Sequence, residues 1–482
     1  MASTCCSIIP PYLLDQLARA DDAELARRAR ATLQRDADLR AHRRSATADG
    51  TKRLPAAPQP RLDAAVRRIC DAQHAEKLPG TVVREEGAPA TGDAGADEAY
   101  AGLGATWTLL HDAFGRASLD GKGLPLIGTV HYGKDYDNAF WDGTQMVFGD
   151  GDGQVFGRFT ASIDVIGHEL AHGVTEHTAG LLYQGQSGAL NESVSDVVGA
   201  MVRQHAAGQT ADQADWLIGA ELLMPGVQGR ALRDMLHPGT AYDDPQLGQD
   251  PQPAHLDDYV QTSDDNGGVH LNSGIPNRAF ALAAVAIGGL SWEGAGRAWY
   301  AALTGPAISA DCDFATFAAL TVDAAREIWG TGAAQVAAIE DAWRQVGVLP
   351  AADDPVEGAD GSDDGQGADG SGAGDGEEPA PTGEVPAADA ELLVRKSGGI
   401  AGRRQEVRTR LADLPDDDTT VWQQLLSSRT LQRLAAQASP SYRDAFIYQV
   451  ACEQTGVDVA VPDPELPYPV RELLDRTLER GR

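Results

Sequence analysis

Two histidines and a glutamate in VIGHELAHGVTEH, residues 165–177, have the types and the spacing that metal chemistry needs. On a helix, positions four apart share one face, so His168 and His172 can hold a single ion. Glu169, beside the first histidine, projects toward a water molecule that such an ion binds. Catalytic zinc usually takes three protein ligands and a water, so a third ligand must come from elsewhere. The stretch alone also fits a helix with two solvated histidines.

Other blocks extend the pattern on both sides of this stretch. They are YDNAFWDGTQMVFGDGDG at 136–153, TAGLLYQGQSGALNE at 178–192, GALNESVSDVVGAM at 188–201 and DNGGVHLNSG at 265–274. With these blocks the chain resembles the thermolysin-like (M4) metallopeptidases over about residues 75–349. The short N-terminal segment with IIPPYLL is similar to the protealysin branch of that family, whose propeptide is brief.

The resemblance implies a zinc site and side chains that work beside it. The implied zinc ligands are His168, His172 and Glu192. Glu169 would take a proton from the zinc-bound water and pass it to the leaving amine. The side chains that would bind the oxyanion or orient its donor are His270, Tyr183 and Asp265. Asp196 would hold His168 from behind, and Asn191 would hold His172.

Each of these side chains also has an ordinary structural interpretation when it is taken alone. Tyr183 fits a core tyrosine, Asp196 fits an acid on a helix surface, and His270 fits a structural histidine. The joint occurrence of the blocks, in this order, favours the catalytic interpretation of all of them together.

The resemblance also implies a set of substrate-binding residues. Asn138 and Ala139 match an edge strand that pairs with an extended substrate, and Arg233 matches an arginine that binds a substrate carbonyl. The expected pocket for the residue after the scissile bond is apolar, with lining residues Phe156, Phe159, Val165, Ile218, Leu222 and Leu232. Such a pocket favours Leu, Ile, Phe or Val, so we expect cleavage on the amino side of these residues. Some of the six could instead be core positions, and Arg233 a solvated charge.

One part of the family pattern is broken in this chain. Larger secreted members bind two calcium ions beside the zinc helix, and Asp164 and Asp215 match ligands of that site. Arg203 stands where the family has a glutamate, and Leu217 and Ala220 replace further acids. A hard cation needs several oxygen ligands, so we expect the double-calcium site to be absent or reduced. Asp164 and Arg203 are expected to form a salt bridge instead.

The elements expected to position these residues form an α+β, two-lobed thermolysin-like fold. Residues 60–163 alternate short apolar runs with Gly and Asp turns, which predicts a β-rich lobe of strands and hairpins. Residues 164–349 carry long Ala, Leu and Val segments with helical spacing, which predicts a helical lobe. The zinc helix is expected at the junction between the two lobes.

An acidic stretch divides this peptidase-like region from the C-terminal part of the chain. Residues 351–390 hold twelve Asp and Glu, no Lys or Arg, and no aromatic residue. Such a composition cannot bury enough surface to fold, so we predict a disordered linker at about 350–390.

The two ends are expected to regulate the peptidase region. Residues 1–55 fit a propeptide that ends in the connector LPAAPQP, and the maturation site is expected between Arg44 and Arg61. Cys5 or Cys6 could reach the zinc as a thiolate, or be an ordinary thiol. Residues 391–482 resemble emfourin, a small inhibitor associated with protealysin-like enzymes, through SGGIAG, LPDDD and RELLD. A tethered inhibitor would restrain its own protease through high effective concentration; a generic accessory module is the alternative.

Composition excludes some classes of function and leaves others open. The 482 residues carry a net charge of -32, which argues against nucleic-acid binding. No apolar run reaches 18 residues, so a membrane span is not expected. Five scattered cysteines form neither a disulfide framework nor a CxxC pair. The N-terminus lacks a usual secretory signal, so we expect either extracellular location by a non-classical route or a cytoplasmic protein.

The sequence as a whole predicts a zinc-dependent neutral endopeptidase that is made as a proenzyme and acts on proteins or peptides, as a monomer. The alternative is a non-catalytic, protease-like binding protein whose site is blocked by its C-terminal domain. Every catalytic residue type is present, which disfavours this alternative.

Overall fold

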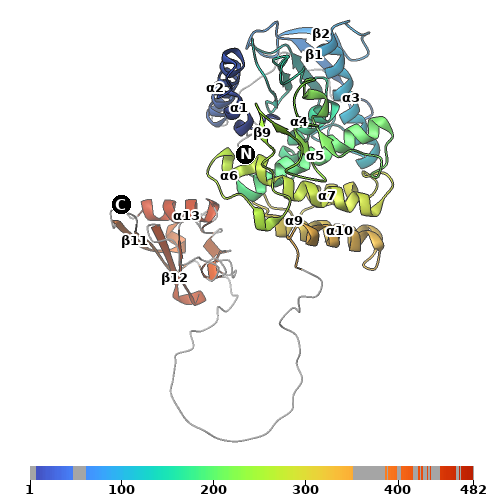
Figure 1. Cartoon of the computed structure of the whole chain (residues 1–482). Helices are drawn as coiled ribbons and strands as arrows, with labels where there is room; N and C mark the ends of the chain where they lie inside the picture. Colours follow the sequence, from blue (N-terminus) through green and yellow to red (C-terminus); the bar gives the residue numbers. More distant parts are fainter. Residues whose placement is uncertain are drawn as a thin grey trace, which may run out of the picture. The chain divides into compact units, whose positions relative to one another are not determined.

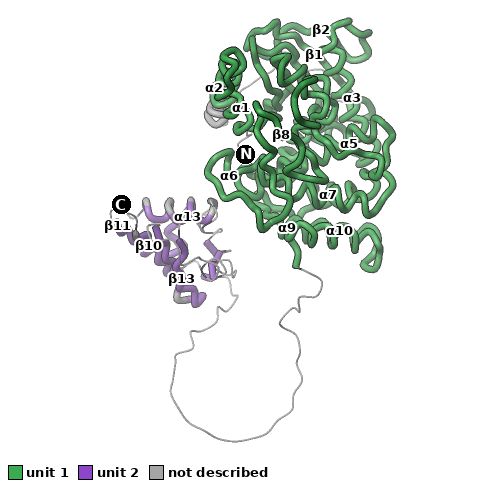
Figure 2. The backbone as a smooth tube through the Cα atoms, viewed as in Figure 1, with its two compact units in different colours: residues 1–359 green, residues 360–482 purple. Residues whose placement is uncertain are grey.

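The computed structural model describes residues 7–46, 61–350 and, with gaps, 386–480. The chain forms two compact units, Met1–Ala359 and Asp360–Arg482, which are described separately (Figure 2). Within the described ranges, the helices are too short or too polar to cross a membrane.

Three features predicted from the sequence lie outside the described residues. They are the cysteines at positions 5 and 6, the connector at 54–60 and the acidic stretch at 351–385. The expectations made for these segments therefore stay predictions.

A five-stranded sheet in the order β2-β1-β3-β5-β4 lies in the lobe that precedes the predicted zinc helix (Figure 1). Its strands are β1 (Arg67–Asp71), β2 (Thr81–Glu85), β3 (Leu126–Val130), β4 (Ala139–Trp141) and β5 (Met146–Phe148). β2 pairs antiparallel with β1, and β4 pairs antiparallel with β5, whereas β3 runs parallel to β1 and β5. Because β4 is an edge strand, one side of its backbone is free to pair with another segment.

The lobe contains the strands expected from the sequence and also one long helix that the sequence analysis did not predict. Helix α3 (Ala94–Phe114) lies between β2 and β3 and makes their connection. It begins at Asp93, whose carboxylate accepts the N–H of Ala96, and ends at Gly115 in a left-handed conformation. Its buried residues recur at helical spacing, so the signal was present but was hidden by its many glycines and alanines.

The N-terminal segment folds onto the same unit. Helices α1 (Pro11–Leu17) and α2 (Ala23–Ala46) lie together at one side of it (Figure 1). Ahead of α1, Ser7 bridges Phe140 of the edge strand β4, and Ile8 and Ile9 are fully buried. The apolar patch IIPPYLL therefore docks through two isoleucines and through the buried leucines of α1.

The second lobe of this unit is mainly helical, as expected from its composition. Its helices are α4 (Ile163–Glu176), α5 (Gly185–Ala207), α6 (Asp265–Asn272), α7 (Gly274–Ile287), α8 (Ala295–Thr304), α9 (Phe314–Trp329) and α10 (Ala334–Gln345). Short strand pairs β6–β7 (Leu217–Ile218, Arg233–Asp234) and β8–β9 (Asp243–Asp244, Gly248–Gln249) lie between α5 and α6. One hydrophobic core continues from the N-terminal segment through both lobes.

The C-terminal unit has its own sheet and its own core. Its antiparallel strands, in the order β11-β10-β12-β13, are β10 (Glu391–Gly398), β11 (Arg403–Arg410), β12 (Phe446–Cys452) and β13 (Val457–Pro462). Helix α13 (Tyr468–Glu479) buries Leu473 and Leu474 in a cluster with strand residues such as Val394 and Tyr448. The unit therefore has the folded core that the sequence after the acidic stretch predicts.

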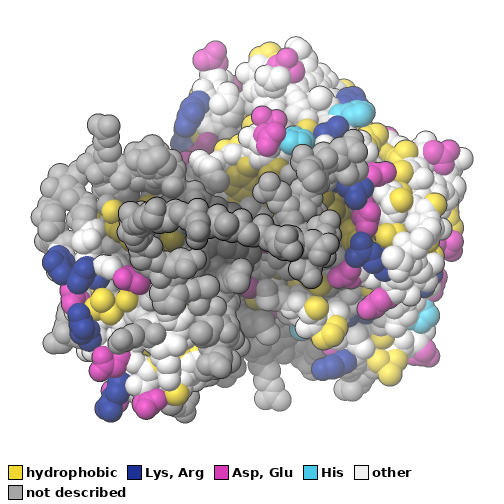
Figure 3. Space-filling view, turned by 90° about the horizontal axis from the view of Figure 1, so that it is seen from below, with side chains coloured by type: hydrophobic (Ala, Val, Ile, Leu, Met, Phe, Trp, Pro, Cys, Tyr) yellow, Lys and Arg dark blue, Asp and Glu magenta, His cyan; other side chains and the backbone are white. Residues whose placement is uncertain are grey.

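Charged side chains of both signs lie next to one another on the face shown in Figure 3. In the C-terminal unit, Glu406 on β11 pairs with Arg395 at 2.9 Å and with Arg404 at 3.0 Å. Exposed pairs of this kind add little stability, and the two cores account for most of the folding free energy.

Candidate metal centre and active site

Helices α4 and α5 pack closely and bring the histidines of one against the acids of the other. Nearly every residue of α4 is buried, including His168, Glu169 and His172. A glycine on α5 makes the close approach possible: a Cβ on Gly199 would lie 2.4 Å from the carbonyl oxygen of Asp164. The sequence thus places a glycine where the two helix backbones come closest.

Three side-chain groups converge between the two helices. The Nε2 atoms of His168 and His172 are 3.2 Å apart. The carboxylate of Glu192 lies 3.4 Å from Nε2 of His168 and 3.6 Å from Nε2 of His172. The three groups predicted as zinc ligands are thus brought together by the fold.

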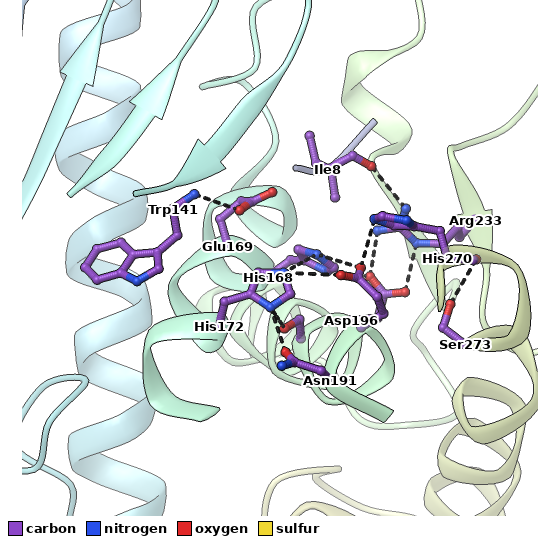
Figure 4. Close-up of polar contacts among 12 residues, drawn as sticks. Ile8, Trp141, His168, Glu169, His172, Asn191, Asp196, Arg233, His270 and Ser273 are labelled. Carbon is purple, nitrogen blue, oxygen red and sulfur yellow. Dashed lines mark hydrogen bonds and ion pairs between the residues drawn. The ribbon is translucent and has the colours of Figure 1, made fainter. Parts of the chain in front are cut away.

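The protonation of the two rings shows why a cation fits between them. Nδ1 of His168 faces a carboxylate oxygen of Asp196 at 2.7 Å, and Nδ1 of His172 faces the amide oxygen of Asn191 at 2.8 Å (Figure 4). Both partners only accept, so each Nδ1 carries a proton, and each Nε2 presents a lone pair when its ring is neutral. Two lone pairs at this distance repel each other unless a cation lies between them.

The spacing of these donors matches zinc. With Zn–N distances of about 2.0–2.1 Å, two ligands of a tetrahedral ion are roughly 3.4 Å apart. The three observed separations, 3.2 to 3.6 Å, lie around that value. The donor set of two imidazoles and one carboxylate is also one that catalytic zinc uses.

Glu169 also lies within reach of the two histidines, in a cluster with ligand atoms no more than 4.8 Å apart. Its Oε2 accepts the N–H of Trp141 at 3.0 Å, whereas its buried Oε1 has no hydrogen-bond partner among the described residues. Burial raises the pKa of Glu169 to about 8, although the charge on His168 opposes this. A buried carboxylate with one free oxygen and a pKa near neutrality is suited to exchange a proton.

Asp196 is a fully buried carboxylate that contacts three side chains. Besides His168, it binds the guanidinium of Arg233 through two bonds of 2.8 Å and accepts the amide N–H of Asn277 at 2.8 Å. Burial opposes its ionisation, but Arg233 and His168 lower the pKa of Asp196 to about 2. The carboxylate is therefore charged at neutral pH and fixes both the ring of His168 and the fork of Arg233.

Tyr183 and His270 both contact the carboxylate of Glu192. The hydroxyl of Tyr183 donates to Glu192 and lies 3.2 Å from Nε2 of His270. Nδ1 of His270 is 2.7 Å from Asp265, which also accepts the backbone N–H of His270. Asp265 and Asn266 have left-handed backbones, with φ of 51° and 52°, and this turn aims the carboxylate back at the ring.

A cavity of about 440 Å³ opens beside Tyr183 and His270. Its wall also includes Asp265 and, from the N-terminal segment, Ser7 and Tyr12. Burial would lower the pKa of His270, but Asp265 and Glu192 raise it. The cavity gives solvent access to the side of the site that holds Tyr183 and His270.

The substrate-edge residues are brought together as predicted, and the chain itself occupies them. The N–H of Ile8 donates to the carbonyl of Ala139 at 3.2 Å, and Arg233 donates to the carbonyl of Ile8 at 3.3 Å (Figure 4). The side chain of Asn138 accepts the N–H of Ile9 at 2.9 Å and donates to its carbonyl at 3.3 Å. The N-terminal segment is thus bound as an additional antiparallel strand.

Comparison with protein families gives three matches along the chain. Residues 52–176 match "Thermolysin metallopeptidase, catalytic domain" and residues 179–348 match "Thermolysin metallopeptidase, alpha-helical domain". Residues 394–478 match Emfourin. The first two matches meet within the segment that joins α4 to α5.

Similar proteins and a similar structure agree with these matches. An extracellular metalloprotease of Pectobacterium carotovorum subsp. carotovorum is 52% identical over 343 residues, which are 71% of this chain and 96% of that protein. Protease PrtS of Photorhabdus sp. (strain Az29) is 53% identical over 290 residues, covering 60% of this chain and 78% of that protein. A solved precursor of protealysin, a metalloproteinase from Serratia proteamaculans, has 50% identity and a TM-score of 0.64 over 71% of this chain and 100% of that chain.

The chain belongs to the thermolysin family of metallopeptidases. It is a zinc-dependent hydrolase of peptide bonds with a thermolysin-like α+β fold, and its C-terminal part is an emfourin domain. The resemblance drawn from the sequence blocks is confirmed, and the alternative of a non-catalytic scaffold finds no support among these relatives.

The six apolar positions predicted to line a specificity pocket all lie in the core of the peptidase. Each is at most 2% exposed, and they share one cluster with Ile8 and Ile9 of the N-terminal segment. None of the six lines the cavity beside Tyr183 and His270. Their part in substrate selection stays a prediction.

The salt bridge predicted between Asp164 and Arg203 is confirmed, at 3.6 Å. The guanidinium also contacts Asp215 at 3.1 Å and Glu221 at 3.0 Å. Burial raises the pKa of Asp164, which also accepts hydrogen bonds from Ser162 and from the N–H of Gly219. The positive charge of Arg203 thus stands among three acids of the peptidase.

Two residues near the predicted zinc ligands were missed by the sequence analysis. The hydroxyl of Ser195 is 3.1 Å from Nδ1 of His172, and its position one helical turn after Asn191 could have revealed it. Asn277 contacts Asp196 from 81 residues away, and nothing local in the sequence announces this contact.

Proposed function

We propose that this peptidase binds one zinc ion through His168, His172 and Glu192, with Glu169 as the general base. The proposal rests on one observation: two imidazole lone pairs and a carboxylate converge at 3.2 to 3.6 Å beside a carboxylate with one unpartnered oxygen. When bound, zinc would polarise the scissile carbonyl and acidify a water molecule.

The side chains then divide the work of hydrolysis. Glu169 takes the proton of the attacking water and gives it to the leaving amine, since its free Oε1 and raised pKa suit both steps. Tyr183 and His270 donate hydrogen bonds to the oxyanion, because both lie at the cavity wall and face the ligand Glu192. Asp265 holds the ring of His270, and Asp196 and Asn191 hold the rings of the two histidine ligands.

We propose that Ile8 takes the place of the substrate residue that follows the scissile bond. Its N–H is bound by Ala139, on the strand expected to pair with an extended substrate, and its carbonyl by Arg233, the side chain expected to bind a substrate carbonyl. A fully buried isoleucine at this place supports cleavage on the amino side of bulky apolar residues. The six apolar positions named above would supply the surrounding pocket.

We propose that residues 1–55 are a propeptide that keeps the precursor inactive. A substrate cannot pair with Ala139 and Asn138 while Ile8 and Ile9 hold them. The peptidase would start to act on proteins only after this segment leaves. Residues 350–390 would then be a linker, and residues 391–482 an inhibitor-like domain that restrains the same protease.

Two further parts of the proposal concern calcium and location. We propose that Arg203 replaces the calcium of larger family members, because its guanidinium already supplies a positive charge to the acids there. We also propose an extracellular enzyme, since relatives identical in about half of the aligned residues are named extracellular proteases.

The experiment that tests the proposed function is intact-mass spectrometry of freshly purified protein, with Glu169→Gln in parallel. Only the wild type should lose an N-terminal fragment of roughly fifty residues over several hours. If both proteins stay whole, deletion of residues 391–482 should release cleavage in the wild type alone. Failure of that shortened wild type to cut any peptide would contradict the assignment of Glu169 and of the site.

A further inference from the structure

The substrate edge of the peptidase continues beyond the residues that the N-terminal strand reaches. Ser7 pairs with Phe140 in antiparallel register, so a strand that ran on past Ile9 would put its next residue opposite Asp137. The N-terminal strand does not continue along the edge past Ile9. The carbonyl of Pro10 instead accepts the N–H groups of Leu13 and Leu14, and α1 begins.

One face of helix α2 covers the edge at this point. Arg28, Thr32 and Asp36 are spaced four apart and therefore lie on the same side of the helix. The hydroxyl of Thr32 accepts the backbone N–H of Asp137 at 3.1 Å. In an antiparallel pair, that N–H would bond a carbonyl of the strand opposite, so Thr32 stands in for a substrate carbonyl.

Arg28 occupies the place of the side chain of a substrate residue opposite Asp137. Its Nε and Nη2 bond the two oxygens of Asp137 at 3.1 and 2.5 Å, the paired geometry that a guanidinium and a carboxylate prefer. Nη1 bonds Asp135 at 3.0 Å, and Nη2 also bonds the carbonyl of Gly151 at 2.8 Å. The side chain of Asp137 is only 3% exposed, so this is a built guanidinium site and not a surface ion pair.

A neighbouring acid adds to the negative potential of this site. Oδ2 of Asp152 is buried and has no hydrogen-bond partner among the described residues. Its charge acts on both Asp137 and Arg28. Once α2 has left, Asp135 and Asp137 lose the guanidinium that now pairs with both of them, and a negative site is left at this end of the edge.

We infer that the mature peptidase extends its substrate edge to Asp137 and selects arginine at the third position after the scissile bond. The inference rests on the proposed function, in which Ile8 takes the first of these positions. The N–H of Asp137 binds the backbone carbonyl of the third residue, and its carboxylate binds the guanidinium. Opposed residues of an antiparallel pair point to the same face, so one residue can make both contacts. Lysine would bind less well, because it lacks the planar fork.

The test uses peptides that differ only at the third position after a leucine-directed cleavage site. Arginine, citrulline and glutamate are compared there, since citrulline keeps the shape of arginine without its charge. For the processed enzyme we expect kcat/KM to be about fivefold higher with arginine than with citrulline, and lowest with glutamate. Most of the difference should lie in KM, and it should shrink as salt increases.

A variant then tests whether Asp137 causes the preference for arginine. In Asp137→Asn, the ratio of arginine to citrulline should fall to about one. Glu76→Gln is the matched control: Glu76 pairs with Arg35 of α2 at 2.7 Å, outside the edge strand, and its loss should leave the ratio unchanged. If Asp137→Asn fails to fold or mature, the peptide series on the wild type still decides.

The outcomes separate this inference from the proposed function. Equal kcat/KM for the arginine and citrulline peptides would overturn the role of Asp137, while their cleavage before leucine would leave the proposed function intact. If none of the peptides is cut by a processed enzyme that has also lost residues 391–482, the proposed function itself has failed.

Discussion

Helices α4 and α5 carry two clusters of ionisable side chains, each around a buried carboxylate, and the charge of that carboxylate is balanced differently in the two clusters. In one cluster, Glu192 meets two histidine rings at 3.4 and 3.6 Å. In the other, Asp164 meets the guanidinium of Arg203 at 3.6 Å. The first cluster presents lone pairs and needs an added cation, whereas the second has its cation in the chain.

The difference shows how one substitution changes what a site requires. A cluster of oxygens without a counter-charge is costly to bury unless an ion binds it. Arg203 removes that requirement, but a guanidinium cannot act as a Lewis acid or hold a water for attack. On the proposed function, the cluster around Glu192 therefore depends on a metal ion, and the cluster around Arg203 does not.

The largest expected effect comes from removing zinc. A strong chelator should lower activity at least a hundredfold and lower the melting temperature by about 10 °C, because ligand binding to the folded state contributes several kcal/mol. Calorimetry and peptide cleavage, with zinc added back, measure both. A calcium-selective chelator is the control and should change neither. If the melting temperature stayed the same without zinc, the first cluster would not need an added cation, and the contrast between the two clusters would be lost.

The next effect should come from breaking the cluster that has its own cation. Arg203→Met leaves Asp164 buried without its counter-charge, which should cost about 2–4 kcal/mol of unfolding free energy. Arg203→Glu should be destabilised as well, but calcium should restore its melting temperature. The wild type should not respond to calcium. A wild-type increase with calcium would contradict the replacement of calcium by Arg203.

A smaller effect should come from the groups that hold the ring of His172. Asn191→Leu removes the acceptor at 2.8 Å and should weaken zinc affinity by about 10- to 100-fold. Ser195→Ala removes the contact at 3.1 Å and should weaken it only a few-fold, since Asn191 remains. Competition with a zinc-binding dye measures both. The reverse order would make Ser195 the main partner of the ring.

The smallest expected effect lies outside both clusters, at an ordinary ion pair of the β-rich lobe. The hydrogen bond to Asp150 raises the pKa of His131 to about 9, with Asp93 adding to the shift. This stabilisation is complete below about pH 6.5, the unfolded value, and is lost as pH rises through 9. Because the ring is partly exposed, the loss should be about 1 kcal/mol. His131→Asn should flatten that part of the curve of unfolding free energy against pH.

Helical periodicity accounts for the parts of the site that could be predicted from sequence. His168 and His172 had to share a face once α4 was assumed, and Ser195 follows Asn191 by the same rule. The strand pattern of the first lobe was predicted only in part. Helix α3 was missed because its glycines and alanines resemble turn residues when the period is not followed.

Contacts between distant segments were predicted only where the family resemblance supplied them. Arg233 and Asn138 were expected to bind substrate, but not to be held already by Ile8 and Ile9. The contact between Asn277 and Asp196 was not predicted at all. Such pairs depend on how whole elements pack, and their residues carry no local signal.

The sequence by itself determined the chemistry of this protein: which side chains can bind zinc, which carboxylate can move a proton, and where Arg203 replaces acids. The pair of histidines and the glutamate beside them follow from residue type and from spacing within one helix, which the backbone geometry fixes locally. The third ligand and the exchange at Arg203 were implied by the family resemblance. Only the tertiary structure decided what occupies the site and what surrounds it. Residues 7–9 lie on the substrate edge and α2 covers Asp137 because burying Ile8, Ile9 and the leucines of α1 in one continuous core selects that arrangement.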